Sequence, residues 1–225
     1  RITVLNDYDA YLAGLQKNVS EKEKQLEQLS REVSDIRKKE SKKLTESIKN
    51  ALLDLNFLDV QFMMEFAETD YTANGIDDAQ FLISTNPGEP VKPLGKVASG
   101  GELSRIMLAI KTVLADAEDT PTLIFDEIDA GISGVTAAKV GEKLKLIGKS
   151  RQVICITHLS QIAAVADSHF LIEKSAENES VKTRIRLLNE EDSVKELARI
   201  LGGDKITSSI MESAREMKEM AKSEI

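Results

Sequence analysis

Two short apolar runs separated by a helical pattern constrain the fold of this chain more than any other feature. The runs are Thr122–Phe125 and Val153–Thr157, and both are apolar almost throughout, as is typical of strands buried on both faces of a sheet. Between them, Val135–Ile147 has the spacing of a helix. A strand–helix–strand unit places its two strands in parallel. We therefore expect an α/β lobe with a parallel βαβ core.

Ionisable side chains follow both predicted strands. Asp126 and Glu127 come directly after the first strand, and His158 comes after the second. Ligands of open α/β sheets gather outside the carboxyl ends of the strands. One carboxylate there can hold Mg²⁺ while its neighbour orients or deprotonates an attacking water, and a histidine can hydrogen-bond a terminal phosphate. Asp129, two residues further on, could sense the same site across an interface. Taken singly, each of these residues also has a structural interpretation.

A second motif, Ser99-Gly100-Gly101-Glu102, precedes an amphipathic helical pattern over Leu103–Leu114. With Ser99 as N-cap and Glu102 at the third helical position, it has the form of a capping box. A helix N-terminus also presents free N–H groups, and two glycines let a phosphate approach the backbone closely. The two interpretations are compatible, because capping orients the loop that would bind the anion.

The first part of the chain has a heptad pattern with one charged residue in its seam. The seam residues are Leu5, Tyr8, Leu12, Leu15, Val19, Lys22, Leu26, Leu29, Val33 and Ile36. Such a 3.5-residue period requires a partner helix to cover it, and the register slips by one from Leu44 onward. We expect residues 1–56 to form one strand of an antiparallel coiled-coil arm and residues 57–225 to form the lobe. A surface helix and a self-associating coiled coil are the alternatives.

Weaker patterns place the remaining elements. Strands are expected at Phe57–Ala67 and Ala79–Ser84, a loop at Pro87–Pro93, a hairpin from Phe170–Glu173 and Thr183–Leu188 around Ala176–Ser180, and helices at Ser193–Leu201 and Ser208–Lys222. The helix over Ser193–Leu201 should stop at Gly202–Gly203. The second histidine, His169, lacks a functional context and is expected to be structural.

Composition narrows the class of protein. The formal net charge is −8, with eleven Lys/Arg against nine Asp/Glu in residues 1–50 and nineteen against twenty-nine in the rest, so any contact with DNA should be local. Cys155 is the only cysteine and is expected to be buried, in a reducing compartment. We find no apolar run of the roughly 20 residues needed to span a bilayer, and we predict a cytoplasmic location. Because the chain begins with Arg1, we expect a fragment or a processed piece.

Taken in order, the Ser99–Glu102 motif, the two strand-end acids and the histidine resemble the second half of an ABC-type ATPase head. The long helical arm is similar to the SMC-like branch of that family. Three longer strings resemble a bacterial DNA repair group within this branch: FLISTNPGEPVKPLGKVASGGELSRIMLAIK (Phe81–Lys111), FDEIDAGISG (Phe125–Gly134) and ITHLSQIAAVAD (Ile156–Asp167). Ala198–Gly203 fits as well. Ala98 and Glu102 depart from the commonest signature, where leucine and glutamine stand.

The resemblance implies a role for each of these residues. Ser99, Gly100 and Gly101, with Glu102 beside them, would contact the γ-phosphate of ATP held by an opposing head, and Asp129 would be the interface acid. Asp126 would support Mg²⁺, Glu127 would be the catalytic carboxylate and His158 the γ-phosphate switch. It further implies ATP and Mg²⁺ as cofactors, a homodimer through ATP-sandwiched heads, DNA double-strand ends as partner in recombinational repair, no membrane partner, and association with the nucleoid.

The phosphate-binding loop of such a head, G-x-x-x-x-G-K-[ST], is missing from this sequence. Gly148-Lys149-Ser150 offers its last three letters, but Lys143 stands where the first glycine would be, and the tripeptide ends a predicted helix. The resemblance therefore implies an N-terminal half of the same protein that carries the loop, and the fragment alone should be nearly inactive.

Two alternative functions, and the role of one basic stretch, stay open. A nucleotide-binding subunit of an ABC transporter would carry its phosphate loop in the same lobe, where this chain has a coiled coil. A non-catalytic coiled-coil adaptor would not need Glu127 and His158. The basic stretch Arg37–Lys43 either forms a solvated face of the coiled coil or contacts the DNA backbone.

Overall fold

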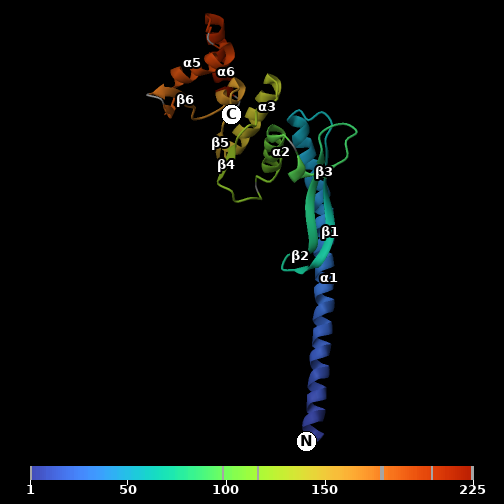
Figure 1. Cartoon of the computed structure of the whole chain (residues 1–225). Helices are drawn as coiled ribbons and strands as arrows, with labels where there is room; N and C mark the ends of the chain where they lie inside the picture. Colours follow the sequence, from blue (N-terminus) through green and yellow to red (C-terminus); the bar gives the residue numbers. More distant parts are fainter. Residues whose placement is uncertain (1, 98, 116, 178–179, 204, 224–225) are drawn as a thin grey trace. The chain divides into compact units, whose positions relative to one another are not determined.

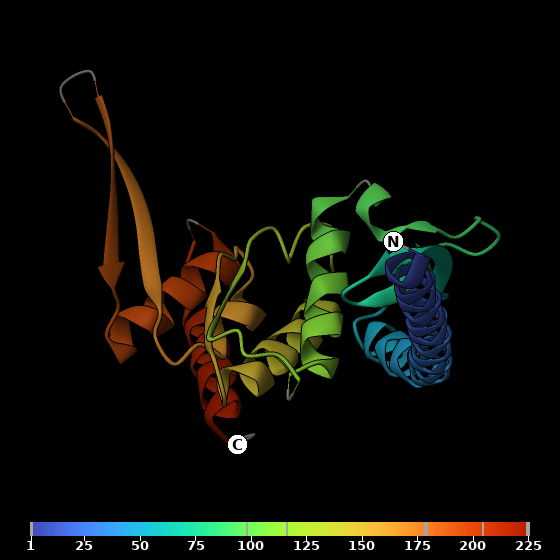
Figure 2. The same cartoon turned by 90° about the horizontal axis from the view of Figure 1, so that it is seen from below.

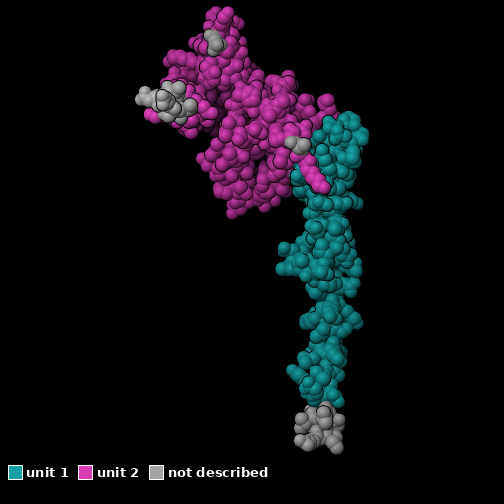
Figure 3. Space-filling model, viewed as in Figure 1, with its two compact units in different colours: residues 1–47, 61–95 teal, residues 48–60, 96–225 magenta. Residues whose placement is uncertain are grey.

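The computed structural model describes residues 2–97, 99–115, 117–177, 180–203 and 205–223; within these ranges it describes no side chains for residues 2–7, 175–177 and 180–181. The chain consists of two compact units (Figure 3). Unit 1 comprises residues 1–47 and 61–95, and unit 2 comprises residues 48–60 and 96–225. The domain boundary predicted between residues 56 and 57 stays a prediction.

Unit 1 contains most of the arm helix and an antiparallel hairpin that lies along it (Figure 1). Helix α1 runs without a break over Ile2–Asp54, and the hairpin consists of β1 (Gln61–Thr72) and β2 (Gly75–Ser84). The two strands are joined by the turn Ala73-Asn74. Gly75, the first residue of β2, has a φ of 97° that favours glycine. A two-residue strand, β3 (Lys92–Pro93), pairs with β2 inside the predicted loop, and proline is tolerated at such an edge. The 3-10 turn η1 (Leu94–Lys96) follows.

The predicted heptad seam is exposed along α1. Each of its described members except Lys22 is an exposed large apolar side chain: Tyr8, Leu12, Leu15, Val19, Leu26, Leu29, Val33 and Ile36. Leu5 lies outside the residues whose side chains are described. The helix ends at Asp54 because Asn56 adopts a left-handed conformation with a φ of 65°. Strand β1 starts at Gln61. The predicted strand start at Phe57 was therefore wrong by four residues.

Unit 2 carries the βαβ core. Its elements are α2 (Gly100–Val113), β4 (Thr122–Phe125), α3 (Gly134–Gly148), β5 (Gln152–Cys155) and the short α4 (Ser160–Ala164). Strands β4 and β5 pair in parallel with Thr122 opposite Gln152 and Phe125 opposite Cys155, as predicted. The buried apolar side chains include Leu108, Ile128 and Val140.

The expectation that both faces of this sheet are buried was wrong for the chain as it stands. Side chains alternate along the strands, so Leu123 and Phe125 are buried while Ile124 is 68% exposed. Ile154 and Ile156, on and just beyond β5, are also exposed. Cys155 is half-buried instead of fully buried. Burial, with smaller contributions from Asp129 and Asp126, raises the pKa of its thiol to about 12, so the thiol is unreactive at neutral pH.

The C-terminal part of unit 2 combines a hairpin with two helices. The hairpin is formed by β6 (Phe170–Glu177) and β7 (Ser180–Leu187), which extend away from the helices in Figure 2; residues 178–179, within the predicted turn, lie outside the described residues. Helix α5 (Glu190–Gly202) stops at Gly203, as predicted, and α6 (Ser208–Ser223) follows. A small core joins α4, α5 and α6, namely Ala163, Ala164, Leu197, Ala198 and Ala214. No helix among the described residues has the length and apolar character needed to cross a membrane.

Candidate functional site

The site residues predicted from sequence come together at one edge of the parallel sheet. Asp126 and Glu127 follow β4, and His158 follows β5 by three residues. The ladder continues past β5, since Ile156 N–H donates to Phe125 O at 3.0 Å. Both strands therefore end at the same level, and the two acids and the histidine lie at their carboxyl ends, as expected.

Helix α2 begins at the predicted cap. Ser99 has extended backbone angles, and its Oγ accepts a hydrogen bond from Glu102 N–H at 3.4 Å, which satisfies one of the free donors at the helix start. The signature position Ala98 lies outside the described residues. Ser104, one turn later, donates from its Oγ to Asp126 O at 2.8 Å. The start of α2 is therefore joined directly to the strand end that carries the two acids.

The two glycines of α2 serve a close packing contact. A Cβ on Gly100 would lie 2.6 Å from Glu127 Oε2, and one on Gly101 would lie 2.8 Å from Ala130 Cβ and 2.9 Å from Ala130 O. A side chain at position 101 would push the backbone of the segment 127–130 away from α2, whereas one at position 100 would displace only the flexible end of the Glu127 side chain. The sequence interpretation gave these glycines a role in phosphate approach alone. The packing requirement at Gly101 is independent of any ligand.

Glu127 stands in an unusual backbone conformation. Its φ is 55°, in the left-handed region that non-glycine residues seldom adopt. Asp126 Oδ1 accepts the Glu127 N–H at 2.9 Å and so stabilises this turn. Both side chains are exposed. Mg²⁺ is commonly held by one or two carboxylates together with phosphate oxygens and water, and an exposed Asp126 fits that chemistry. Among the residues that the structure describes, no cluster of three or more His, Cys, Asp or Glu forms a complete metal site.

Asp129 differs from the other two acids because it is buried. Its side chain is 4% exposed, whereas that of His158 is 74% exposed. Asp129 Oδ2 accepts hydrogen bonds from Thr157 Oγ1 at 2.5 Å and from His158 N–H at 2.7 Å. Asp129 is thus brought to His158 of the same chain.

Arg105 is a site residue that sequence reasoning missed. Its guanidinium is buried and donates from Nη1 to Ala130 O at 3.1 Å and to Ile128 O at 3.4 Å. Its Cζ also lies 5.6 Å from the centroid of the Phe57 ring, a cation–π distance. Burial lowers the pKa of Arg105, opposed by Glu102, but a guanidinium stays charged. An arginine one turn into an amphipathic helix is ordinarily exposed, so the sequence gave no signal.

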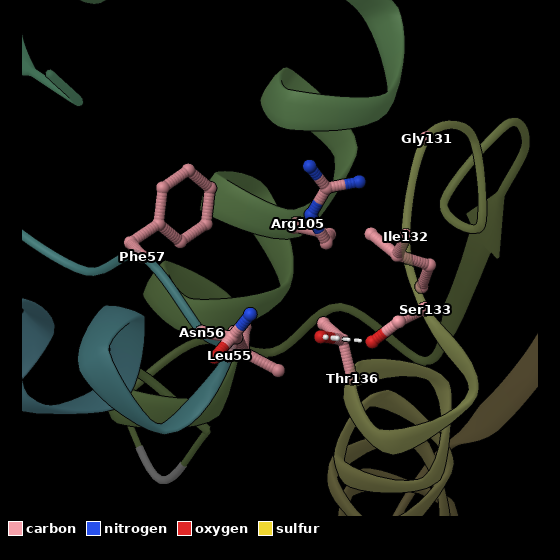
Figure 4. Close-up of a pocket in the computed structure, with 8 residues that line it drawn as sticks. All are labelled: Leu55, Asn56, Phe57, Arg105, Gly131, Ile132, Ser133 and Thr136. Carbon is pink, nitrogen blue, oxygen red and sulfur yellow. Dashed lines mark hydrogen bonds between the residues drawn. The ribbon is translucent and has the colours of Figure 1, made fainter.

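A small pocket of about 290 Å³ borders Arg105. Leu55, Asn56, Phe57, Arg105, Gly131, Ile132, Ser133 and Thr136 line it. Figure 4 shows the Arg105 guanidinium between Phe57 and the segment Gly131–Ile132. The Oγ atoms of Ser133 and Thr136 lie 3.4 Å apart at the start of α3. The pocket is next to the predicted site residues, but none of them lines it.

Two further sequence predictions have structural counterparts. Gly148 is the last residue of α3 and Lys149 is its C-cap, so Gly148-Lys149-Ser150 is a helix end and not a phosphate-binding loop. The Nδ1 of His169 lies 2.9 Å from Ser193 Oγ, and burial, with a smaller contribution from Lys218, lowers the pKa of this histidine. It packs against α5, away from the strand ends.

A comparison with solved structures identifies the fold. A crystal structure of an Smc head domain with a coiled coil and joint, from Pyrococcus yayanosii, aligns with 72% of this chain and 29% of that one, at a TM-score of 0.51 and 21% identity. The fold is therefore that of an SMC-type head, in which a coiled-coil helix precedes an α/β lobe. No family model matches the chain.

Sequence relatives define the family. Proteins named DNA repair protein RecN are 44% identical over 203 residues in Halalkalibacterium halodurans and 37% identical over 236 residues in Bacillus subtilis, with 88% and 98% of this chain covered. The protein of that name from Treponema pallidum is 50% identical over 143 residues, which cover 64% of this chain. The chain belongs to the RecN family and matches its C-terminal region. It spans between 25% and 41% of the length of these relatives.

Proposed function

We propose that the intact protein is a RecN-like ATPase of recombinational DNA double-strand break repair, in which ATP binding and hydrolysis drive dimerisation and release of its heads. One observation carries this proposal. The start of α2, the two strand-end acids and His158 lie on a single unit, joined by the Ser104–Asp126 hydrogen bond and by the close contact of Gly100 with Glu127. The names of the relatives support DNA repair as the process.

Each residue has a proposed role at this edge. Ser99, Gly100 and Gly101 offer the N–H groups and positive dipole end of α2 to the terminal phosphate of ATP held by an opposing head, with Glu102 beside them. Asp126 supports Mg²⁺, which would neutralise phosphate charge in the bound nucleotide. Glu127 takes a proton from, or orients, the attacking water. His158 contacts the terminal phosphate.

An N-terminal half of the same protein is the proposed source of the phosphate-binding loop. The exposed Ile124, Ile154 and Ile156 support this assignment, because β4 and β5 form a two-stranded sheet whose apolar face requires cover. By the same reasoning the exposed seam of α1 pairs with a second helix. We expect the chain alone to hydrolyse ATP at a negligible rate.

The remaining assignments concern location and DNA. A cytoplasmic, nucleoid-associated protein is proposed from the RecN relatives. DNA ends are the proposed partner. Within the basic stretch Arg37–Lys43, the exposed residues Lys38, Lys39 and Lys42 are available to phosphates, whereas Arg37 pairs with Asp77 and Lys43 with Glu40. Two or three such contacts would give weak, strongly salt-dependent binding.

ATP turnover tests the proposal directly. We would measure hydrolysis by the 225-residue chain alone, by a separately expressed upstream half, and by their mixture. Activity on mixing only is expected. Robust turnover by this chain alone would contradict the split head, and inactivity of the intact protein would favour the adaptor alternative.

A substitution identifies the catalytic carboxylate. Glu127→Gln in the intact protein should lower turnover by at least about 100-fold, consistent with loss of a general base, and should trap ATP-bound dimers detectable by size-exclusion chromatography with light scattering. Asp119→Asn is the matched control, since Asp119 is an exposed acid before β4, at the opposite end of the strand. Rapid release of ATP with unchanged turnover in Glu127→Gln would remove Glu127 from this role.

A further inference from the structure

The carboxylate of Asp129 is the most heavily used acceptor at the strand ends. A single oxygen, Oδ2, receives Thr157 Oγ1 at 2.5 Å and His158 N–H at 2.7 Å, and lies 3.0 Å from His158 Nδ1. The Thr157 hydroxyl in turn accepts Leu159 N–H at 3.0 Å. Asp129 therefore holds by hydrogen bonds the backbone turn that carries His158, and its Oδ2 lies within ion-pair distance of one nitrogen of the His158 ring.

The position of this carboxylate is fixed by its neighbours in the chain. Ile128 is fully buried, and the carbonyls of Ile128 and Ala130 both accept from Arg105. Gly101 admits Ala130 against α2. The residues on either side of Asp129 are thus held against α2, the helix that has Ser99 as its N-cap. No ligand is needed to set the carboxylate in place.

We infer that Asp129 is a positioning residue for His158 of the same chain. A ring nitrogen 3.0 Å from a carboxylate oxygen is repelled if it presents a lone pair and attracted if it carries a proton. Asp129 therefore places the proton of the neutral imidazole on Nδ1, and the other nitrogen, Nε2, is left to the solvent-exposed side of the ring. The partner of one ring nitrogen determines the chemistry of the other.

This role differs from the one that the family resemblance implies. An acid that senses a second head across an interface has to reach the surface, whereas the Asp129 side chain is 4% exposed and its Oδ2 is occupied within its own chain. The inference rests on the proposed function only where it concerns what Nε2 contacts. Nε2 would face the terminal phosphate, and it donates a hydrogen bond there when it takes up a second proton. The tautomer itself does not depend on any nucleotide.

Nitrogen-15 NMR of the 225-residue chain tests the inference without ATP. The chain has two histidines, so histidine-selective labelling gives two imidazole spin systems, and His169→Gln assigns them. At about pH 8.5, well above the ordinary imidazole pKa, we expect His158 to show a protonated Nδ1 and an unprotonated Nε2. A protonated Nε2 as the main form in the unsubstituted chain would overturn the inference.

Two substitutions separate positioning from mere structural support. Asp129→Ala should shift His158 toward the Nε2-protonated tautomer, whereas Thr157→Val, which removes one hydrogen bond to the same oxygen but keeps the carboxylate, should leave the Nδ1-protonated form dominant. Loss of that form in Thr157→Val would overturn the inference, because geometry alone would then control the ring. Amide signals of β4 and β5 report whether each variant is folded. If Asp129→Ala is unfolded, the spectra of the unsubstituted chain and of Thr157→Val decide whether the inference holds.

Turnover of the intact protein distinguishes failure of this inference from failure of the proposed function. With the expected tautomer, Asp129→Ala should lower kcat by about 10-fold or more with little change in KM, consistent with a weakened proton or phosphate contact in the transition state. If the tautomer is as expected but His158→Ala leaves kcat unchanged, the phosphate role of His158 is lost and the positioning by Asp129 stands.

Discussion

Two antiparallel hairpins of similar construction have opposite environments in this chain. In the hairpin β1–β2, Phe62 is 7% exposed and Ile83 is fully buried. In the hairpin β6–β7, Phe170 is 55% exposed, and Ile172, Ile185 and Leu187 are exposed as well. These four side chains form two directly opposed pairs, Phe170 with Leu187 and Ile172 with Ile185, so they cover one continuous apolar face.

The difference shows which of the two hairpins this chain can cover with its own residues. The first hairpin is fixed on α1 by Asp77, whose carboxylate accepts Ser34 Oγ at 2.6 Å and Arg37 Nη1 at 3.2 Å. A two-stranded hairpin with an uncovered apolar face is marginally stable in water, and contiguous apolar patches mark interaction surfaces. The second hairpin therefore has the surface expected of an element that another polypeptide segment covers, as do the exposed isoleucines of β4 and β5.

Truncation of the two phenylalanines should give the largest contrast. Phe62→Ala should destabilise unit 1 by about 3–4 kcal/mol, because a buried ring that packs at 5.1 Å from Phe81 is lost. Phe170→Ala should change stability by less than about 1 kcal/mol in the chain alone. Urea unfolding with amide exchange of the two hairpins as readout measures both. Equal losses would contradict the comparison.

Charges on the exposed hairpin should block association with the upstream half. Ile172→Lys together with Ile185→Lys is expected to weaken binding by about 100-fold, about 2.8 kcal/mol, since burying unpaired charges is costly. Isothermal titration calorimetry gives the Kd. Tyr71→Lys, an exposed aromatic in the first hairpin, is the matched control and should leave the Kd unchanged. Wild-type affinity in the double variant would mean that this face is not the interface.

Removal of the Asp77 carboxylate should have a smaller effect on the first hairpin. Asp77→Ala leaves the buried Ser34 without its acceptor, and we expect a loss of about 1–3 kcal/mol in the free energy of unfolding. Asp192→Asn, which breaks the exposed Arg186–Asp192 pair of the second hairpin region, should cost less than about 1 kcal/mol. Similar losses in the two variants would argue against Asp77 as the anchor.

The Asp77 carboxylate should also make the free energy of unfolding depend on pH. This is the smallest of the expected effects. The Ser34 hydrogen bond, with a contribution from Arg37, lowers the pKa of Asp77 in the folded state. Because the folded pKa lies below the unfolded value of about 3.9, this contribution to stability is complete above that pH and is lost as the pH falls through the folded pKa. The stability gap between wild type and Asp77→Ala should therefore narrow below about pH 4. If the stability difference between wild type and Asp77→Ala stayed constant down to about pH 2, the Asp77 carboxylate would be excluded as the source of that difference.

The sequence determined the order and type of most elements, because these follow from local periodicity and chain punctuation. The short elements β3 and α4 were not predicted. Sequence patterns local to each segment predicted the parallel pair β4–β5, the Ser99 cap, the stop of α5 at Gly203 and the uncovered seam of α1. The convergence of Asp126, Glu127 and His158 could be predicted too, since parallel strands end at the same edge. The roles of these residues come from the family resemblance and stay predictions.

Tertiary structure alone decided which polar groups are buried and what holds them. Nothing in the sequence pattern distinguishes a buried Asp129 from an exposed Asp126 three residues earlier, or marks Arg105 as an inward-facing cation. Burial depends on which segments pack together, and the contacts of Arg105 with Ile128 and Ala130 join residues more than twenty positions apart. The exposure of one face of β4–β5 and one face of β6–β7 could not be predicted for the same reason. An apolar pattern shows that a side chain favours burial, but it does not show which segment covers that side chain.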